Sequence, residues 1–520
     1  MRLNRRGLLV GAAGMVAETN MLAGMLAHAA TRPRYTWSKG AMDGGGYCNA
    51  MATDPLHPGH AAAAGDVWGE FATRTGGDLW YPTMTGATSI GAIYGRAVAY
   101  SRKTPGLRYF GIGVLKDAWN QGYLGVVGPN SLTLERRNTT VGFSTYLPKG
   151  NAGEVPRAVG NLIAVDYDAA SGKEYVYMLT RQGLMRTSDG GATLQPLGLP
   201  AVAPTLAWSA LCVCPDGSLL AASFRTSDRA GSKVWRIMNP RGTATVAPVP
   251  GAPAVVEDIA VVDGVVYAAC GTSGLYRVNP SGAWKALSPA TFRGCHLSSV
   301  AGHGGVLWVG NGVGMTDHRY IAKSTNAGRT FTWTTMPAHV SSAVMGANRT
   351  WWLAPTWPGL DKHGYSVSQL AVDPVNPNIC YSAGRAGIVA TRDGGKTWRP
   401  AMNGLDGSEI IQVQAGPRAG EAWATDTDWK GIHTVDHWKT CRQVPHEVPR
   451  LHPPALVRSR HGVRYEVSLS NPRRMLVGGV DVATDYFRSA CVNPSDLAVS
   501  GDRRIYVGLY GGGVLVGHPR

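Results

Sequence analysis

The sequence predicts an all-β fold assembled from repeated units, and three observations lead to this expectation. Glycine and proline are abundant, with 68 and 32 copies among 520 residues, and only 16% of the residues are charged. No long stretch with a helical 3.6-residue period follows residue 30. About ten times, an apolar run is followed by a polar turn and a second apolar run that ends near glycine. Turn-rich chains with many short strands are typical of all-β architectures.

The clearest copy of this unit runs from Leu370 to Gly384. The other copies begin, at intervals of roughly 30 to 70 residues, near Met51, Val98, Ile163, Leu211, Ile259, Ser299, Val413, Val467 and Leu497. This period fits β-propeller blades, whose strands pair within a blade while the blades pack around an axis. The repeats alone leave open one large ten-bladed propeller or two smaller ones. We expect an N-terminal propeller over 30–370 and further blades over 371–520, with a boundary between 345 and 410.

A second repeat resembles the sialidase-type Asp-box, S/T-x-D-x-G-x-T-W. The best copy is Thr391–Trp398, and weaker or degenerate copies lie at 187–194, 324–331, 73–80 and 435–438. Such a box is a hairpin turn in which Asp or Asn caps backbone N–H groups, Gly takes a positive φ and the aromatic residue enters the blade core. We therefore expect the box carboxylates to cap turns rather than catalyse, and the box tryptophans to be core residues: Asp189 and Asp393, and Trp80, Trp398 and Trp438.

A short tetrad occurs twice, as Asp66-Val-Trp-Gly69 and Asp428-Trp-Lys-Gly431. Both copies follow an apolar, alanine-containing segment, and a box-like sequence follows each copy about ten residues later. Two carboxylates at matching points of two repeat units indicate the acid/base pair of a glycoside hydrolase. The alternative is that both are ordinary turn carboxylates.

The N-terminus predicts export. Arg5 and Arg6 precede an apolar stretch that ends in Ala27-His-Ala29, as in a twin-arginine signal, so we expect a signal peptide over 1–29 and a periplasmic or secreted protein. No other segment approaches 18 consecutive apolar residues, which predicts no membrane span. We expect a monomer.

Charge and ligand chemistry exclude several classes of function. The net charge is +16, but no Lys/Arg run is longer than two, which favours a solvated basic surface, attractive to anionic polymers, over a nucleic-acid site. Eight cysteines permit disulfides in an exported protein, and their spacing does not indicate zinc. His57-Pro-Gly-His60 is the only close histidine pair, and its spacing favours a turn over a metal site. We therefore expect no metal and no cofactor.

Several stretches, taken in order, resemble glycoside hydrolase family 74, the xyloglucanase-type enzymes. The similarity runs from about residue 36 to 440 and is carried by 44–58, 66–72, 150–166, 351–374 and 424–433. Asp66-Val-Trp-Gly-Glu-Phe-Ala resembles the family motif Asp-Ile-Gly-Gly-Ala-Tyr, and Asp428-Trp-Lys-Gly resembles its second copy. Trp68 and Lys430 replace one glycine of each motif, and Asn161 replaces a family arginine. The resemblance implies two tandem propellers that form a cleft.

The resemblance also implies an inverting endo-glycanase that acts on a β-glucan, xyloglucan-like or bacterial envelope polysaccharide, with Asp66 as general base and Asp428 as general acid. Burial against Trp429 would keep Asp428 protonated, and Asp426 is a rival candidate for the acid. Tryptophans outside the boxes are candidate stacking platforms for sugars, or else core residues: Trp68, Trp119, Trp351, Trp352, Trp357 and Trp429. Two alternatives remain, a non-catalytic propeller for glycan binding or complex assembly and, third, a sialidase, whose Arg-Ile-Pro motif is missing.

Overall fold

The structure of the chain is a computed structural model. It describes residues 33–40, 48–65, 69–85, 94–113, 122–138, 141, 143, 160–201, 203, 205–279, 282–287, 290–312, 319–335, 366–384, 387–405, 410–426, 430–444, 455–460, 462–469, 472–509 and 511–520. These residues form ten four-stranded antiparallel sheets and a short helix, α3 (Asp485–Ala490). The predicted all-β fold is confirmed.

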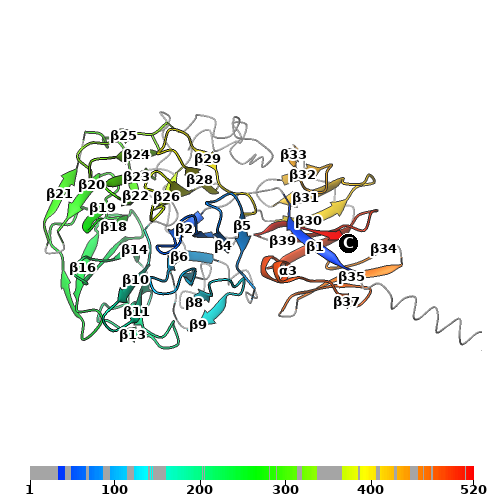
Figure 1. Ribbon diagram of the computed structural model, residues 1–520, viewed down its shortest axis with the longest axis horizontal. Helices are drawn as coiled ribbons and strands as arrows, with labels where there is room; N and C mark the ends of the chain where they lie inside the picture. The colour runs from blue at the N-terminus through cyan, green and yellow to red at the C-terminus, as the bar shows by residue number, and fades with distance from the viewer. Residues whose placement is uncertain are drawn as a thin grey trace, which may run out of the picture.

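Seven of the sheets close into a ring, and each is built from one continuous segment of chain. Their first strands lie next to one another in the order β2, β6, β10, β14, β18, β22 and β26, and β26 then packs against β2. We number these sheets blades 1 to 7. Because the ring closes after seven blades, the arrangement differs from one ten-bladed propeller. Figure 1 shows the ring on the left of the molecule.

The strands of blades 1 to 4 are β2 (Cys48–Thr53), β3 (Ala61–Gly65), β4 (Glu70–Thr73), β5 (Trp80–Pro82); β6 (Tyr94–Tyr100), β7 (Arg108–Gly113), β8 (Gly122–Val127), β9 (Glu135–Arg137); β10 (Ile163–Asp168), β11 (Lys173–Thr180), β12 (Gly183–Thr187), β13 (Gln195–Pro196); β14 (Leu206–Val213), β15 (Leu219–Arg225), β16 (Lys233–Met238) and β17 (Thr245–Pro248). Those of blades 5 to 7 are β18 (Asp258–Val262), β19 (Val265–Ala269), β20 (Leu275–Val278), β21 (Trp284–Leu287); β22 (Leu297–His303), β23 (Val306–Asn311), β24 (Ile321–Ser324), β25 (Thr332–Trp333); β26 (Val367–Val372), β27 (Cys380–Gly384), β28 (Gly387–Thr391) and β29 (Arg399–Pro400).

The other three sheets form a second unit, blades 8 to 10, on the right in Figure 1. Their strands are β30 (Ile410–Ala415), β31 (Ala422–Asp426), β32 (Lys430–Thr434), β33 (Arg442–Val444); β34 (Val457–Arg460), β35 (Val463–Ser468), β36 (Arg474–Val477), β37 (Val480–Asp481); β38 (Pro494–Val499), β39 (Ile505–Leu509), β40 (Gly513–Pro519) and β1 (Tyr35–Lys39). Strand β1 pairs with β40 in the register Tyr35 to Pro519, so the last blade contains both ends of the described chain. We propose that the boundary between the units lies between Pro400 and Ile410.

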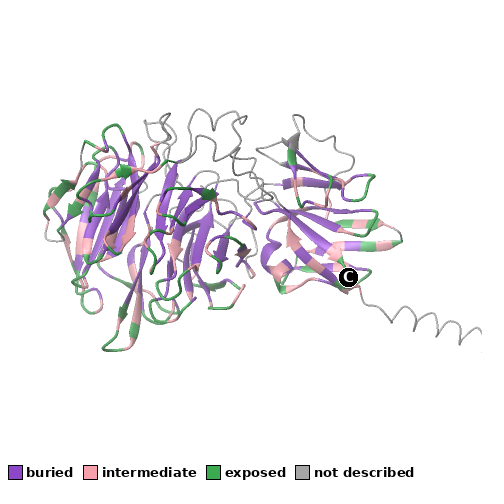
Figure 2. Cartoon of the chain, turned by 45° about the horizontal axis from the view of Figure 1, so that its top comes forward, coloured by how far each residue is buried: buried purple, intermediate pink, exposed green. Residues whose placement is uncertain are grey.

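Nine of the ten predicted unit starts fall on the first strand of a blade. The exception is Val467, which lies on β35, the second strand of blade 9. The first strand of that blade, β34, alternates between exposed and half-buried residues, so it lacks the apolar run that marks the other units. Figure 2 shows that buried residues follow the strands through both units.

Five turns between the third and fourth strands of a blade share one hydrogen-bond pattern. In the best copy, the Thr391 hydroxyl accepts from the N–H groups of Asp393 and Gly395, at 3.4 and 2.8 Å, and Asp393 accepts from Thr397 N–H at 2.9 Å. Hydrogen bonds from Thr397 lower the pKa of Asp393 to about 2. The other copies begin at Thr73, Thr187, Ser324 and Thr434. The box carboxylates therefore act as turn caps, as predicted.

The turn in blade 8 differs from the predicted pattern at Trp438. The hydrogen bonds begin at Thr434, which places Trp438 at the glycine position of the turn, with a φ of 65°, and Cys441 at the aromatic position. Trp438 is nevertheless buried, as are Trp80 and Trp398. All three are core residues, but Trp438 reaches the core from a different position of the turn.

Each of these turns within the ring packs against the preceding blade. A Cβ at Gly395 in blade 7 would touch Trp308 of blade 6, and one at Gly77 in blade 1 would lie 3.0 Å from Ala401 of blade 7. Blade 1 therefore uses blade 7 as its predecessor, although the two are at opposite ends of the ring sequence. Hydrogen bonds complete this junction: Met51 N–H to Gln369 Oε1 at 2.8 Å and Trp80 Nε1 to Ala401 O at 2.7 Å.

We expect Trp80→Ala to lower the free energy of unfolding by about 3–5 kcal/mol, because a fully buried indole is removed from the junction of blades 7 and 1. Hydrogen exchange should accelerate on both β2 and β26. Trp398→Ala is the matched control, since Trp398 holds the same turn position but packs against Trp308 of blade 6. Trp398→Ala should lower the free energy of unfolding by a similar amount without accelerating hydrogen exchange at β2. Accelerated exchange at β2 in both variants would contradict the view that Trp80 specifically stabilises the junction of blades 7 and 1.

Candidate functional site

Both tetrads fall at the connection between the second and third strands of their blades. The first lies between β3, which ends at Gly65, and β4, which begins at Glu70; the second begins between β31, which ends at Asp426, and β32, which begins at Lys430, so its last two residues belong to β32. In an antiparallel blade this connection lies at the end opposite to the box turn. The tetrads therefore occur at the same connection, one in blade 1 of the ring and one in blade 8 of the second unit.

The predicted site residues themselves lie outside the residues that the structure describes: Asp66, Trp68, Trp119, Trp351, Trp352, Trp357, Asp428 and Trp429. For Asp426, the rival acid, only its place at the end of β31 is described. Their roles remain predictions, and the site is built here from the described residues around the tetrads.

Glu70 is the first residue of β4 and directly follows the first tetrad. It is fully buried, and among the described residues neither carboxylate oxygen has a hydrogen-bond partner. Burial raises the pKa of Glu70 well above its ordinary value. Burial therefore favours the neutral form of the Glu70 carboxyl.

The sequence prediction missed Glu70, although a signal was present. Glu70 stands where the motif of family 74 has alanine, on a strand whose next residues, Phe71 and Ala72, are fully buried. An ionisable residue in an otherwise buried strand is unusual unless it is paired or has a function. A carboxylic acid kept neutral by burial is one of the groups from which enzymes make proton donors.

Tyr123 lies near Glu70 on the neighbouring blade. It is the second residue of β8, which follows the equivalent connection in blade 2, and it is buried. Burial raises the pKa of Tyr123, and the nearby carboxyl of Glu70 acts in the same direction. The Arg136 guanidinium lies 4.9 Å from the centre of the Tyr123 ring. A buried carboxyl group and a buried phenol thus lie near each other at the starts of β4 and β8.

A second buried glutamate lies across the ring and is fully paired. Glu257 precedes β18 in blade 5, and it accepts from His296 Nε2 at 2.9 Å and lies 3.4 Å from Arg229 Nη1. Although burial opposes ionisation, Arg229 and His296 hold the pKa of Glu257 below its ordinary value. The neighbouring Asp258 is also buried, and burial raises its pKa to about 6. Glu257 therefore resembles a structural ion pair, in contrast to Glu70.

The two buried glutamates should respond to the same substitution with opposite signs. A carboxyl with a raised folded pKa contributes stability that is fully present below its unfolded pKa, about 4.3, and is lost as pH rises through the folded value. We expect Glu70→Gln to remove this loss and to raise the free energy of unfolding at pH 7 by about 1–3 kcal/mol.

Glu257→Gln is the control, because it leaves the Arg229 charge buried without its partner. It should lower the free energy of unfolding at pH 7 by about 3–5 kcal/mol. Denaturant titrations from pH 4 to pH 8 measure both effects. If the free energy of unfolding depends on pH in the same way in wild type and in Glu70→Gln, then Glu70 is ionised in the folded protein at neutral pH.

All eight cysteines are buried, and they form no disulfides with one another. The described residues include no helix long and apolar enough to cross a membrane.

Comparison with solved structures identifies the architecture. The chain is similar to the xyloglucanase of glycoside hydrolase family 74 from Xanthomonas campestris, with a TM-score of 0.63 and 15% identity over 94% of this chain and 100% of that one. It is also similar to the family 74 enzyme of Niastella koreensis, with a TM-score of 0.61 and 14% identity over 93% of this chain and 74% of that one. The chain has the fold of the family 74 enzymes. The resemblance read from the sequence is therefore confirmed as a similarity of fold.

The sequence itself matches no protein-family model and no curated protein. At about 15% identity, a shared fold does not transfer an activity, because function depends on the site residues.

Proposed function

We propose that the chain is an exported glycoside hydrolase, an inverting endo-glycanase that cleaves a β-glucan, xyloglucan-like or bacterial envelope polysaccharide. The observation that carries the proposal is that the two tetrads occur at the same connection, the one between the second and third strands, of one blade in each unit. The fold of the family 74 enzymes supports the same assignment.

The proposed chemistry assigns one carboxyl group to each tetrad. Asp428 donates a proton to the glycosidic oxygen, which leaves with one sugar chain, while Asp66 takes a proton from the water that attacks the anomeric carbon from the opposite face. This reaction inverts the configuration at that carbon and needs the two carboxyl groups about 6.5–9.5 Å apart, so that the water fits between them. The aromatic rings within the tetrads, those of Trp68 and Trp429, would stack on the sugars.

Glu70 is consistent with this division of roles. The proposed base, Asp66, has to be ionised, and a second ionised carboxyl four residues away would raise its pKa by like-charge repulsion. Because burial raises the pKa of Glu70 and disfavours its charged form, this repulsion is reduced. The net charge of +16 favours polymers that carry some negative charge, by long-range attraction.

We expect Asp66→Asn and Asp428→Asn each to lower turnover by about 10²–10⁴-fold, because each removes one half of the acid/base pair. Release of reducing ends from xyloglucan, mixed-linkage glucan, cellulose and anionic bacterial exopolysaccharides measures the loss. The thermal melt should stay within a degree or two of wild type, since neither change removes buried apolar area.

Asp393→Asn serves as the control for a carboxylate in a turn. Asn326 already caps the equivalent turn in blade 6 with the same hydrogen bond, so this variant should retain both stability and activity. Full activity in both tetrad variants would refute the proposed pair. No release of reducing ends from any polymer by the folded wild-type protein would instead favour a non-catalytic propeller for glycan binding or complex assembly.

A further inference from the structure

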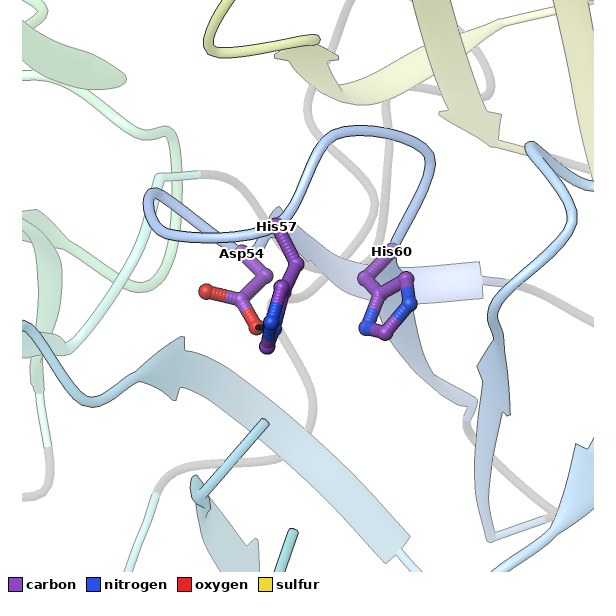
Figure 3. Close-up of side chains that lie close together, drawn as sticks. All are labelled: Asp54, His57 and His60. Carbon is purple, nitrogen blue, oxygen red and sulfur yellow. Dashed lines mark hydrogen bonds and ion pairs between the residues drawn. The ribbon is translucent and has the colours of Figure 1, made fainter. Parts of the chain in front are cut away.

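Three potential metal ligands meet in the turn between β2 and β3 of blade 1. Asp54, His57 and His60 each offer one ligand atom, and these atoms all lie within 4.8 Å of one another. Figure 3 shows the three side chains gathered on one side of the turn. Within the described part of the chain, no other group of three histidine, cysteine or carboxylate side chains comes this close.

We propose that Asp54, His57 and His60 bind a divalent transition metal ion, with Zn²⁺ as the best match. Two imidazole nitrogens and one carboxylate oxygen form a mixed N/O ligand set of the kind that zinc accepts, and three protein ligands leave a fourth position for water. Calcium and magnesium prefer oxygen ligands, so two histidines disfavour them.

The distances fit a site that needs only a small side-chain movement. Zinc bonds of about 2.0–2.2 Å place neighbouring ligand atoms of a tetrahedral site about 3.3–3.5 Å apart. His57 Nδ1 already lies 3.3 Å from Asp54 Oδ2. His60 has to approach by roughly an ångström, which its side chain can do because it is only partly buried. The His57 side chain is 46% exposed, so the metal has a path from solvent.

The backbone of the turn is already fixed in place. The fully buried carboxylate of Asp54 accepts N–H groups from Leu56 at 2.9 Å and from Gly106 of blade 2 at 2.8 Å. Gly59 N–H donates to Asp373 Oδ2 of blade 7 at 2.9 Å. Each oxygen of Asp54 keeps a free lone pair, so the carboxylate can bind a metal without losing these bonds. A bound ion would therefore lie in a turn of blade 1 that hydrogen bonds already connect to blades 2 and 7.

One feature of the environment limits the expected affinity. Burial lowers the pKa of His60, and the positive charges of Arg74 and Arg108 act in the same direction. The same positive charges repel a dication. We therefore expect weaker binding than at a thiolate zinc site. The spacing of the two histidines alone favours a turn over a metal site. The structure adds a third potential ligand, the buried carboxylate of Asp54, three residues before His57.

The test measures metal binding directly, on the full chain without a histidine tag and after dialysis against a chelator. Calorimetric titration with Zn²⁺ should show one equivalent bound, Co²⁺ should give the visible absorption of a tetrahedral site, and saturating Zn²⁺ should raise Tm by a few degrees. His57→Gln and His60→Gln should each weaken Zn²⁺ binding at least about tenfold and remove the rise in Tm.

His303→Gln is the matched control. His303 lies at the end of β22, with Nδ1 3.8 Å from Asp263 Oδ1 and a side chain that is 44% exposed, and within the described part of the chain it belongs to no group of three potential ligands. This variant should bind Zn²⁺ like wild type. Thermal melts measured in the presence of a chelator should superimpose for wild type and all variants. Loss of the fold would then be excluded as the cause of weaker Zn²⁺ binding. Equal Zn²⁺ binding by wild type, His57→Gln and His60→Gln, or no binding by wild type, would overturn the proposal. The turn lies at the opposite end of blade 1 from the tetrad, so neither outcome depends on hydrolytic activity.

Discussion

The junction between blades 7 and 1 is the constraint on which the ring depends. Every blade of the ring is one continuous segment, so no strand crosses from the last blade into the first. The ring is held closed by packing and by hydrogen bonds such as Met51 to Gln369 and Trp80 to Ala401. An interface made only of non-covalent contacts can open locally, and its stability then sets the stability of the whole ring.

The strand that could have closed the ring is used in the second unit instead. Strand β1 pairs with β40, which joins residues about 480 positions apart, as between Ser38 and His518. The chain thus starts in the second unit, passes once around the ring and returns. Helix α3 adds a direct contact between the units, since the Ser489 hydroxyl donates to Pro82 O and accepts from Met84 N–H. Blade 1 therefore carries the ring closure, the contact with the second unit and the first tetrad.

The repeated apolar runs were sufficient to predict the blades, because a buried first strand needs such a run wherever it lies. They could not predict how many blades close a ring. The first strands of the blades other than blade 9 look alike in this respect, and the choice depends on particular side chains, such as Gln369, that meet another blade far away in sequence. The pairing of β1 with β40 is equally non-local. Within blade 8, the sequence pattern predicts Trp438 at the aromatic position of the turn because of its residue type. The hydrogen bond from Trp438 N–H to Thr434 places it at the glycine position instead.

The connection at which both tetrads occur could be predicted, because apolar strands and box-like turns flank both copies. Glu70 was missed, since motif-based reasoning did not weigh the apolar residues that follow it. The described structure holds two buried glutamates with opposite environments, and this contrast carries information. Glu257 has cationic partners and needs no function to explain it. Among the described residues Glu70 has no hydrogen-bond partner, and we expect it to lower stability at neutral pH, so selection for stability alone would favour an apolar residue there, such as the alanine of the family 74 motif. An uncompensated acid beside the proposed base is the kind of local conflict that proteins retain at functional sites. This conflict makes the first tetrad, more than the shared fold, the part of the molecule where a function specific to this chain should be sought.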